Sequence, residues 1–374
     1  MSETIRTLRL DELDAFQRLL ERCYGHRRGF NDRASPDLFR ADEEATDCWL
    51  VVESDGRIVS HVGTYPLEVM LGPARVMTGG IGDVATLPGE RGKGYMARLL
   101  EATIARMRER GIPLSALWGD RQRYGSFGWE TCGLGYILSL NRRSLERSGV
   151  QPAEIEEVDP RDPEVVARVR ELHATLPFRV ERPRLGLTLL RGSTRVFLGA
   201  DGYLLASNDY AGNPDVIELA SPTGREAELV FGAMQWMSGG SAEVRLGFDE
   251  GERLERLARA MNHWRLNTQG MLRIIDWPRL LTDLRPVLEQ RAAGVAPFEA
   301  CLGCRWRGEV QWATIEWDGA ALAVSTERRG DGIEVELPLL TALLLGGPHA
   351  PPARLGPFGH LLPVPLHIPP LDHV

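Results

Sequence analysis

The segment VATLPGERGKGYMARLL, residues 84–100, joins an apolar run to a helical pattern through a glycine-rich turn. Glycine lets the backbone approach a ligand closely, because no Cβ stands in the way. The turn has three of them, Gly89, Gly92 and Gly94. The amides of residues 91–96 fall in the first turn of the expected helix, where N–H groups lack intrahelical partners and the helix dipole is positive. The segment therefore predicts a site for a phosphate or pyrophosphate, with Arg91 and Lys93 adding charge.

Three kinds of phosphate-binding turn can be compared with this segment. A Walker loop would need glycine at position 87 and serine or threonine at position 94, where the sequence has Leu87 and Gly94. A dinucleotide fingerprint would need G-x-G-x-x-G and a following acidic strand end, which are both missing. The third kind, R/Q-x-x-G-x-G/A between a strand and a helix, fits residues 91–96 in all but the last position, Met96. The segment thus resembles the coenzyme A turn of the GNAT acyltransferases.

Hydrophobic periodicity around the turn predicts a mixed chain of strands and helices in three units. The first has a strand and helix in residues 5–24, with Asp11 as the helix N-cap, and two strands joined at Asp55-Gly56. Its helix over 95–111 precedes a buried strand at 113–118. A polar, proline-containing stretch at 147–163 separates it from a fainter version of the same pattern. A third unit begins near residue 271 and ends in a proline-rich tail, 346–374.

A second segment, LSALWGDRQRYGSFGWE at 114–130, resembles the later GNAT segment in which a tyrosine lies on a short helix beside the bound thioester. Its Y-G-x-F-G-W pattern, together with Met96, resembles the enhanced-intracellular-survival (Eis) type of acetyltransferase. The resemblance covers essentially the whole chain and implies an α/β (α+β) fold. It implies a catalytic GNAT domain at 1–145, a degenerate GNAT-like domain at 146–270 and a sterol-carrier-protein-like domain at 271–374, whose tail reaches the active site.

The resemblance assigns the cofactor and the general acid. Acetyl-CoA would lie along the strand end and the turn, where it would be bound by Val84, Ala85, Thr86, Arg91, Gly92, Lys93, Gly94, Tyr95 and Met96. The strand residues would pair with the pantetheine arm like an added strand, and the amide near Val84 would polarise the thioester carbonyl. Tyr124 would donate its phenolic proton to the coenzyme A sulfur, unless it is a core aromatic with a satisfied hydroxyl.

The general base and the acceptor site depend on less specific signals. In Eis-type proteins the terminal carboxylate reaches the active site, which here would be that of Val374, in place of the usual aromatic last residue. His373 or Asp372 are alternative bases. The apolar residues of the tail predict burial: Leu361, Leu362, Leu366, Ile368 and Leu371. Strand alternation puts Asp83 on the opposite face from Val84, either meeting a cationic substrate or lying at the surface. Trp118 would be a substrate wall or a packing residue.

Composition restricts the other classes of function. The 374 residues carry a net charge of −8, which disfavours a general nucleic-acid binder. The apolar runs are too short to span a membrane, and the polar N-terminus has no signal-peptide core. Five sparse cysteines fit a reducing compartment, so we expect a cytoplasmic protein. The lone C-x-x-C pair, Cys301 and Cys304, has no second pair to complete a zinc site, so we expect no metal.

Together these features predict an acetyl-CoA-dependent N-acetyltransferase. The family resemblance implies a primary amine as acceptor, on an aminoglycoside, a polyamine or a lysine side chain, and a homohexamer as the assembly. Two alternatives stay open. A non-catalytic acyl-CoA- or lipid-binding protein would need a large apolar cavity in the C-terminal unit. A peptide-modifying enzyme would need an open groove at the acceptor site.

Overall fold

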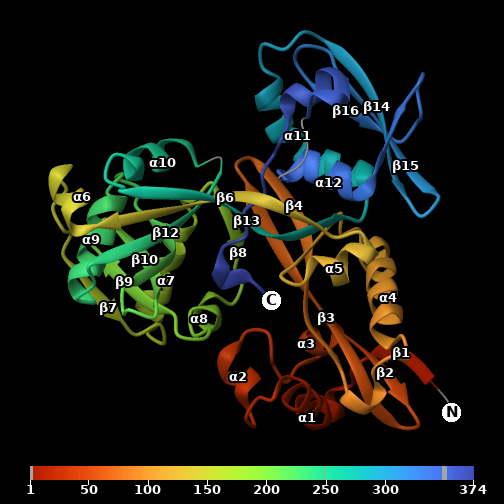
Figure 1. The fold of residues 1–374 in the computed structure, drawn as a ribbon, viewed down its shortest axis with the longest axis horizontal. Coiled ribbons are helices and arrows are strands. Elements are labelled where there is room, and N and C mark those ends of the chain that lie inside the picture. Colours follow the sequence, from red (N-terminus) through yellow and green to blue (C-terminus); the bar gives the residue numbers. More distant parts are fainter. Residues whose placement is uncertain (1–2, 249, 348–351) are drawn as a thin grey trace.

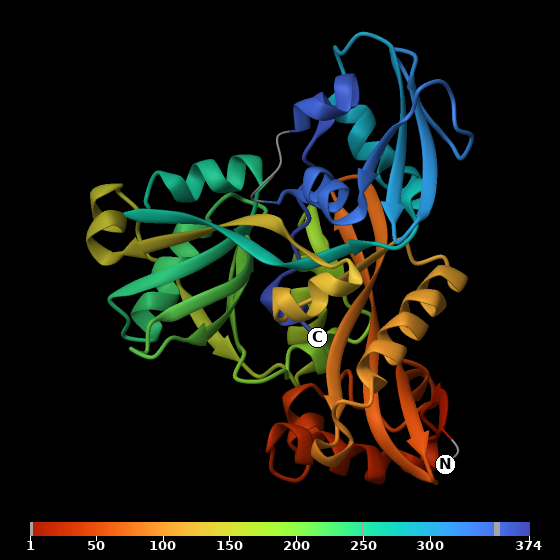
Figure 2. The same ribbon diagram turned by 45° about the vertical axis from the view of Figure 1, so that its right-hand side comes forward.

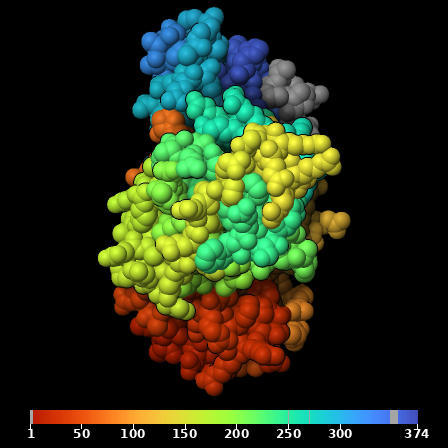
Figure 3. All heavy atoms as spheres, turned by 90° about the vertical axis from the view of Figure 1, so that its left-hand side faces the viewer, coloured from red at the N-terminus to blue at the C-terminus, as the bar shows by residue number. Residues whose placement is uncertain are grey.

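The computed structural model describes residues 3–248, 250–347 and 352–374. Figure 1 shows three lobes that meet near the C-terminus, coloured red to orange, green and blue along the chain. A long sheet runs through the first two lobes, and a smaller sheet forms the third. In Figure 3 the second lobe, in yellow and green, lies between the red N-terminal residues and the blue C-terminal ones.

The first lobe follows the predicted pattern closely. Its elements are β1 (Glu3–Thr7), α1 (Leu13–Tyr24), α2 (Phe30–Ala34), α3 (Glu43–Asp47), β2 (Trp49–Ser54), β3 (Arg57–Leu71), β4 (Ala74–Thr86), α4 (Tyr95–Glu109), β5 (Leu114–Leu117), α5 (Arg121–Tyr124) and β6 (Glu130–Asn141). The predicted hairpin at Asp55-Gly56 is confirmed, because both residues have the positive φ angles, 49° and 74°, that a tight turn needs.

The predicted N-cap at Asp11 is wrong. A short 3-10 helix over Leu10–Glu12 precedes α1, and Glu12 organises it. The Glu12 carboxylate accepts the Arg9 amide at 3.0 Å and both terminal nitrogens of Arg6 at 2.7 and 2.8 Å. The ion pair between Glu12 and Arg6 of β1 therefore holds the start of α1 in place, whereas the sequence predicted a cap by Asp11.

The second lobe contains more regular structure than its sequence suggested. Its elements are α6 (Arg142–Arg147), β7 (Ile155–Val158), α7 (Pro163–His173), β8 (Phe178–Glu181), α8 (Leu185–Thr188), β9 (Arg195–Gly199), β10 (Gly202–Asn208), β11 (Pro214–Ala220), α9 (Glu226–Trp236), β12 (Ser241–Gly247), α10 (Gly251–Ala258) and β13 (His263–Ile274). The polar stretch at 147–163, expected only to separate two units, itself holds β7 and the start of α7. Asp162 caps α7 by accepting the Glu164 amide at 2.9 Å.

The strand order of the long sheet is symmetric about its centre. It runs β1-β2-β3-β4-β5-β13 and continues β6-β12-β11-β10-β9-β7, with β8 added beside β3. The last strand of each half is exchanged, since β13 pairs with β5 and β6 pairs with β12. Figure 2 shows these two strands, β6 in yellow and β13 in teal, crossing between the lobes. The exchange joins both halves into one continuous sheet.

The third lobe packs a four-stranded sheet on two helices. Its elements are α11 (Trp277–Ala292), β14 (Phe298–Trp306), β15 (Glu309–Trp317), β16 (Leu322–Ser325), β17 (Ile333–Glu336) and α12 (Leu337–Leu345), with sheet order β16-β15-β14-β17. Its core continues into the first lobe, where Leu114 and Ile274 belong to the same apolar cluster as α11 and α12. Both residues of the C-x-x-C pair lie on β14 as free thiols.

The described part of the tail returns from the third lobe to the centre of the molecule. All five of its apolar residues that predicted burial are at most 9% exposed, so the prediction is confirmed. The short 3-10 helix Pro370–Asp372 (η5) lies against β11, and the chain then ends beside β4. The C label in Figure 1 marks this position between the first two lobes. The tail thus brings the chain end to the strand that precedes the glycine-rich turn.

Candidate active site

The central feature of the site is a fork between the parallel strands β4 and β5. They pair only from Thr78↔Leu114 to Ile81↔Leu117, where β5 ends. β4 continues for five more residues, paired with β3 on its other side. Among the described residues, no strand therefore neighbours this end of β4 on the β5 side. An extended ligand can hydrogen-bond to such an open strand edge.

A cavity of about 600 Å³ adjoins the end of β4 and the start of α4. It is lined by Cys23, Tyr24, Val84, Ala85, Thr86, Glu90, Arg91, Gly92, Gly94, Tyr95, Met96, Ala97 and Arg123. Eight of the nine predicted cofactor residues are in this lining. The ninth, Lys93, is exposed, and its ammonium binds Glu90 Oε2 at 2.6 Å. The strand end and the turn, which the sequence assigned to one ligand, therefore border one space.

The turn has the geometry that an anion site requires. Gly92 and Gly94 have φ angles of 83° and 77°, in the left-handed region that favours glycine. A Cβ on either residue would meet no atom within 4 Å, so these positions depend on backbone conformation and not on crowding. Gly94 is the N-cap residue of α4, and in the described part of the chain no side-chain hydrogen bond caps this helix. The free amides and the positive end of the dipole therefore face the cavity.

Tyr24 is a site residue that the sequence analysis missed. It ends α1, sixty positions from β4 in the sequence, and its hydroxyl donates to the Val84 carbonyl oxygen at 2.9 Å. Burial and the nearby Asp83 raise the pKa of Tyr24, so the hydroxyl stays protonated at neutral pH. No local sequence signal distinguishes this tyrosine, because its role depends on how α1 packs over the sheet.

Asp83 is placed by an irregularity that strand alternation cannot predict. Its φ angle is 53°, and the pairing of β3 with β4 shifts here, so that Val62 faces two residues, Asp83 and Val84. The bulge directs the carboxylate toward Tyr65, whose hydroxyl donates to Asp83 Oδ2 at 2.5 Å. Burial raises the pKa of Asp83, opposed by the Tyr65 hydrogen bond. The pairing shift could not be predicted from strand alternation, but the two side chains do contact different clusters: Val84 packs against the cluster of α4, and Tyr65, the partner of Asp83, belongs to the cluster of α1. Tyr65 is a second residue that the sequence analysis missed.

The chain end lies on the glycines of β4. A Cβ built on Gly80 would lie 2.5 Å from Val374 Cγ2, and one built on Gly82 would lie 2.6 Å from the Val374 carbonyl carbon. Tyr65 is the next neighbour of Gly82, at 3.1 Å from the same built position. Glycine in a strand interior marks a close approach of another group, so the GGIG run at 79–82 was an available signal. Val374 and Asp83 therefore come together at one end of the fork.

Trp118 and His373 pack beside this chain end. Their rings are stacked, with centroids 3.9 Å apart. The His373 ring also contacts the Ile368 carbonyl oxygen, 3.1 Å from Nε2. Burial lowers the pKa of His373 to about 3, which makes it a weak base. Trp118 thus packs against the tail. This contact fits the second of the two roles predicted for Trp118, packing, and not that of a substrate wall.

Tyr124 closes the β5 side of the fork. It is the last residue of α5, and its ring lies over Gly119, where a Cβ would approach Tyr124 Cε2 to 2.4 Å. It belongs to the apolar cluster that contains Tyr95 and Leu99 of α4. Burial raises the pKa of Tyr124 above its usual value of 10, so the phenol carries its proton at neutral pH. The cavity lining includes its neighbour Arg123 and not Tyr124 itself.

The described residues contain neither a metal-binding cluster nor a membrane-spanning helix. Within residues 3–248, 250–347 and 352–374, no three His, Cys, Asp or Glu side chains are grouped closely enough to hold a metal ion. In the same part of the chain, every helix is too short or too polar to cross a membrane.

The arrangement defines a class of protein. A strand fork, a left-handed glycine turn at a helix N-terminus and a protonated tyrosine at the fork can hold a phosphorylated ligand with its reactive end between β4 and β5. In agreement with this, residues 4–132 match the family model of the acetyltransferase (GNAT) domain. The chain therefore carries a GNAT acetyltransferase domain at its N-terminal end.

Solved structures extend the likeness to the whole chain. A GCN5-related N-acetyltransferase from Kribbella flavida is 20% identical with a TM-score of 0.74, over 100% of this chain and 98% of that one. A GCN5-related N-acetyltransferase from Anabaena variabilis is 16% identical with a TM-score of 0.68, over 95% and 92%. Eis1 from Mycobacterium abscessus is 16% identical with a TM-score of 0.63, over 95% and 92%. A search of curated protein sequences gives no match. The chain thus shares its complete fold with these proteins.

Proposed function

We propose that this protein transfers the acetyl group of acetyl-CoA to a primary amine. The observation that carries the proposal is the cavity of about 600 Å³ that joins the open end of β4 to the uncapped N-terminus of α4. This shape suits a ligand with an extended arm and a pyrophosphate. Acetyl-CoA has both, and its thioester supplies the acetyl group. The match of residues 4–132 to the acetyltransferase domain supports the same conclusion.

The residues of the cavity divide the binding between them. The amides at the start of α4 face the pyrophosphate, and Arg91 adds a positive charge at the rim of the turn. Val84, Ala85 and Thr86 offer main-chain groups to the pantetheine arm. The Asp83 carbonyl oxygen lies 2.9 Å from His61 Nδ1, and the peptide group is planar and trans, so the Val84 N–H points the opposite way. That N–H would then polarise the thioester carbonyl.

Tyr124 acts as the general acid. Its phenol is buried and protonated, and it closes the fork opposite β4. It donates its proton to the coenzyme A sulfur when the carbon–sulfur bond breaks. The phenolate would then regain a proton from solvent.

The acceptor end of the fork is acidic, which suits an amine. A primary ammonium has a pKa near ~10 and must lose a proton before its nitrogen can attack the thioester. The Val374 carboxylate, seated on Gly82, takes this proton. Its competitors are less suitable, because Asp372 is tied to Arg182 in a buried ion pair and His373 has a strongly lowered pKa. The Asp83 carboxyl accepts the Tyr65 hydroxyl beside this position.

We extend the proposal to the organisation of the chain. Domains at 1–145, 146–270 and 271–374, of the GNAT, GNAT-like and sterol-carrier-like kinds, agree with the symmetric long sheet and with the third lobe having a sheet of its own. The likeness to Eis1 supports an Eis-type protein, for which we infer a cytoplasmic hexamer. The lipid-binding alternative is disfavoured, because the cavity of about 810 Å³ beside the third lobe is not wholly apolar: its lining mixes Arg108, Asp276, Arg279 and Glu309 with apolar residues.

The proposal is tested by free-thiol release from acetyl-CoA with a panel of amines that includes polyamines, aminoglycosides and lysine peptides. We expect release that depends on one class of amine, with mass spectrometry showing one added acetyl group on that amine. Binding of acetyl-CoA without release on any amine would contradict the proposed reaction and favour a cofactor-binding protein.

The base is tested by removing Val374 alone. We expect the rate to fall by about 100-fold with little change in acetyl-CoA affinity, since general-base catalysis contributes a factor of this order. A truncated chain with the full rate and an unchanged pH dependence would mean that the base lies elsewhere.

A further inference from the structure

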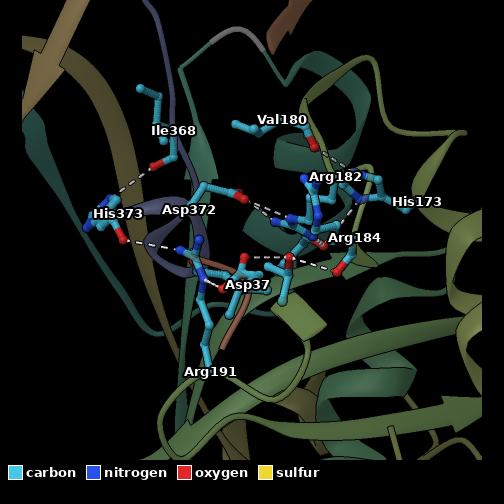
Figure 4. A network of polar contacts seen from close by, with 12 residues as sticks. Asp37, His173, Val180, Arg182, Arg184, Arg191, Ile368, Asp372 and His373 are labelled. Carbon is cyan, nitrogen blue, oxygen red and sulfur yellow. Dashed lines mark hydrogen bonds and ion pairs between the residues drawn. The ribbon is translucent and has the colours of Figure 1, made fainter. Parts of the chain in front are cut away.

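We infer that Arg182 and Arg191 of the second lobe are positioning residues that clamp the last four residues of the chain onto the β4 glycines. This inference rests on the proposed function, because the residue so placed is the proposed base, Val374. A chain end is ordinarily among the most mobile parts of a protein. Catalysis by a terminal carboxylate would therefore need a device that fixes it. Figure 4 shows the contacts that form this device.

Arg182 makes the inner contact of the clamp. Its guanidinium binds Asp372 through Nε at 2.8 Å and Nη2 at 2.6 Å, and it binds both oxygens of Glu218 at 2.8 and 2.6 Å. All three side chains are at most 4% exposed. Two paired hydrogen bonds fix the orientation of a planar guanidinium on each carboxylate. Asp372 is therefore held rigidly, two residues before the chain end.

A second layer holds Glu218 in turn. Tyr203 donates to Glu218 Oε1 at 2.5 Å, and His173 Nδ1 lies 3.3 Å from the same oxygen. His173 Nε2 faces the Val180 carbonyl oxygen at 2.9 Å. These contacts tie the inner clamp to α7, β8, β10 and β11, so the scaffold of the second lobe supports it.

Arg191 makes the outer contact and spans three parts of the molecule. Its Nη1 donates to the Leu371 carbonyl oxygen at 2.7 Å and to the His373 carbonyl oxygen at 3.3 Å. Its Nε donates to Asp37 Oδ1 at 2.7 Å, and Thr188 donates to Asp37 Oδ2 at 2.8 Å. Asp37 belongs to the first lobe, so Arg191 connects the tail to the lobe that holds the proposed cofactor site.

The contacts of the clamp extend to the residue next to Val374. The Arg191 contact to His373 is one residue from Val374, and the His373 ring is stacked on Trp118. Beyond it, the missing Cβ atoms of Gly80 and Gly82 make the space that Val374 fills. Main-chain contacts, ring stacking and the space on the glycines, together with the Arg182–Asp372 pair, thus fix all four residues from 371 to 374.

The first test uses Arg191→Gln, Arg191→Lys and Asp372→Asn, and measures removal of Val374 by carboxypeptidase Y through intact-mass spectrometry. The matched control is Arg265→Gln, which breaks a two-bond pair with Glu243 at 2.7 and 2.8 Å, outside the clamp. Trimming by a protease follows the population of the opened segment. We expect Arg191→Gln and Asp372→Asn to lose Val374 at least about ten-fold faster than wild type, Arg191→Lys to lie between, and the control to match wild type.

The second test measures turnover of the same intact variants. We expect kcat to fall by about ten- to 100-fold in the clamp variants, as for other ångström-scale misplacements, while the KM for acetyl-CoA stays as in wild type. A lost fold would raise that KM and lower the thermal midpoint, and Arg191→Lys keeps the test valid if Arg191→Gln does not fold.

The outcomes separate the clamp from the proposed base. Faster trimming with the wild-type kcat would uphold the clamp and remove the terminal carboxylate from the chemistry. Unchanged trimming in Arg191→Gln and Asp372→Asn would overturn the clamp, whatever happens to kcat.

Discussion

In each half of the long sheet, a helix connects two parallel strands that diverge into a fork. The first fork opens onto a cavity, whereas the second is filled by the tail. In the first half α4 joins β4 to β5, and the fork opens onto the cavity of about 600 Å³. In the second half α9 joins β11 to β12, which pair only at Asp215↔Glu243 and Val216↔Val244. There the tail fills the fork, with Leu371 in the same cluster as Ile217, and His367 against Gly247.

The helix N-termini explain this difference. α4 begins after Gly94, with no acidic residue in its first turn. α9 begins with Glu226, which is fully buried and accepts two hydrogen bonds from Arg256 at 2.7 and 2.9 Å. A carboxylate at a helix N-terminus satisfies the positive end of the dipole from within the chain. In the second half, the Glu226 carboxylate therefore occupies the position at the helix N-terminus that the first half leaves open for a ligand anion. The second half of the sheet thus supports the tail and does not form a second ligand site.

The largest expected effect distinguishes the forks by their chemistry. The first fork is closed by Tyr124, whereas the element after β12, α10, contains no tyrosine. We expect Tyr124→Phe to lower kcat by about 100-fold to 10,000-fold, because the general acid is lost, and to leave acetyl-CoA affinity unchanged. Steady-state kinetics and calorimetric titration measure the two quantities. An unchanged kcat would remove Tyr124 from the mechanism and leave it as a packing residue.

The next largest effect is expected when a carboxylate is placed at the start of α4, as Glu226 is at the start of α9. We expect Gly94→Glu to weaken acetyl-CoA binding by at least about 100-fold, or ~2.7 kcal/mol, since a negative charge would meet the pyrophosphate. Gly94→Ala carries the same backbone strain without the charge and should bind more tightly than Gly94→Glu. Equal acetyl-CoA affinities for the two variants would show that the added charge has no effect. The backbone conformation at Gly94, and not an open anion site, would then distinguish α4 from α9.

Local turn chemistry was predictable from the sequence, and contacts between distant segments were not. The Asp55-Gly56 hairpin, the Gly94 turn and the buried tail depend on the residues at those positions, so their patterns were sufficient. The exchange of β6 and β13 joins strands more than 120 residues apart, as the pairing of Leu138 with Trp264 illustrates. No periodicity encodes such a pairing.

The same distinction between local signals and distant contacts applies to the residues of the site. The residues of the turn carry a motif, and eight of the nine predicted cofactor residues, three on β4 and five at the turn, border one cavity. The bulge at Asp83 and its bond to Tyr65 were not predictable, because alternation assumes a regular strand. Tyr24, Tyr65, Arg182 and Arg191 carry no motif, since each acts on a partner from another element. Their roles follow from the packing of the lobes.

A smaller effect tests how the second fork responds to acid. Burial lowers the pKa of His367 to about 4, so the folded protein keeps this ring neutral while the unfolded chain takes up a proton below its usual pKa of about 6.5. The unfolded state then binds more protons between these values, and stability falls as the pH is lowered through this window.

We expect His367→Leu to lose about 2 kcal/mol less unfolding free energy than wild type between pH 7 and pH 5, as measured by denaturant titration. His263→Gln, at an exposed position, should keep the wild-type dependence. Parallel curves for His367→Leu and wild type would show that the ring does not govern the acid response.

A stability effect of similar size tests whether Glu226 completes the N-terminus of α9. Glu226→Gln removes the charge that faces Arg256, and we expect a loss of about 1–3 kcal/mol in unfolding free energy, because the carboxylate is fully buried and Arg256 is partly exposed. Glu252→Gln is the matched control. It faces the same arginine at 3.4 Å from an exposed position, and we expect less than about 0.5 kcal/mol from it. Both variants should still bind one acetyl-CoA per chain with the wild-type kcat. Equal losses for the two would mean that Glu226 is an ordinary ion-pair residue, and a second bound acetyl-CoA in Glu226→Gln would show that its charge is what closes this fork to the ligand.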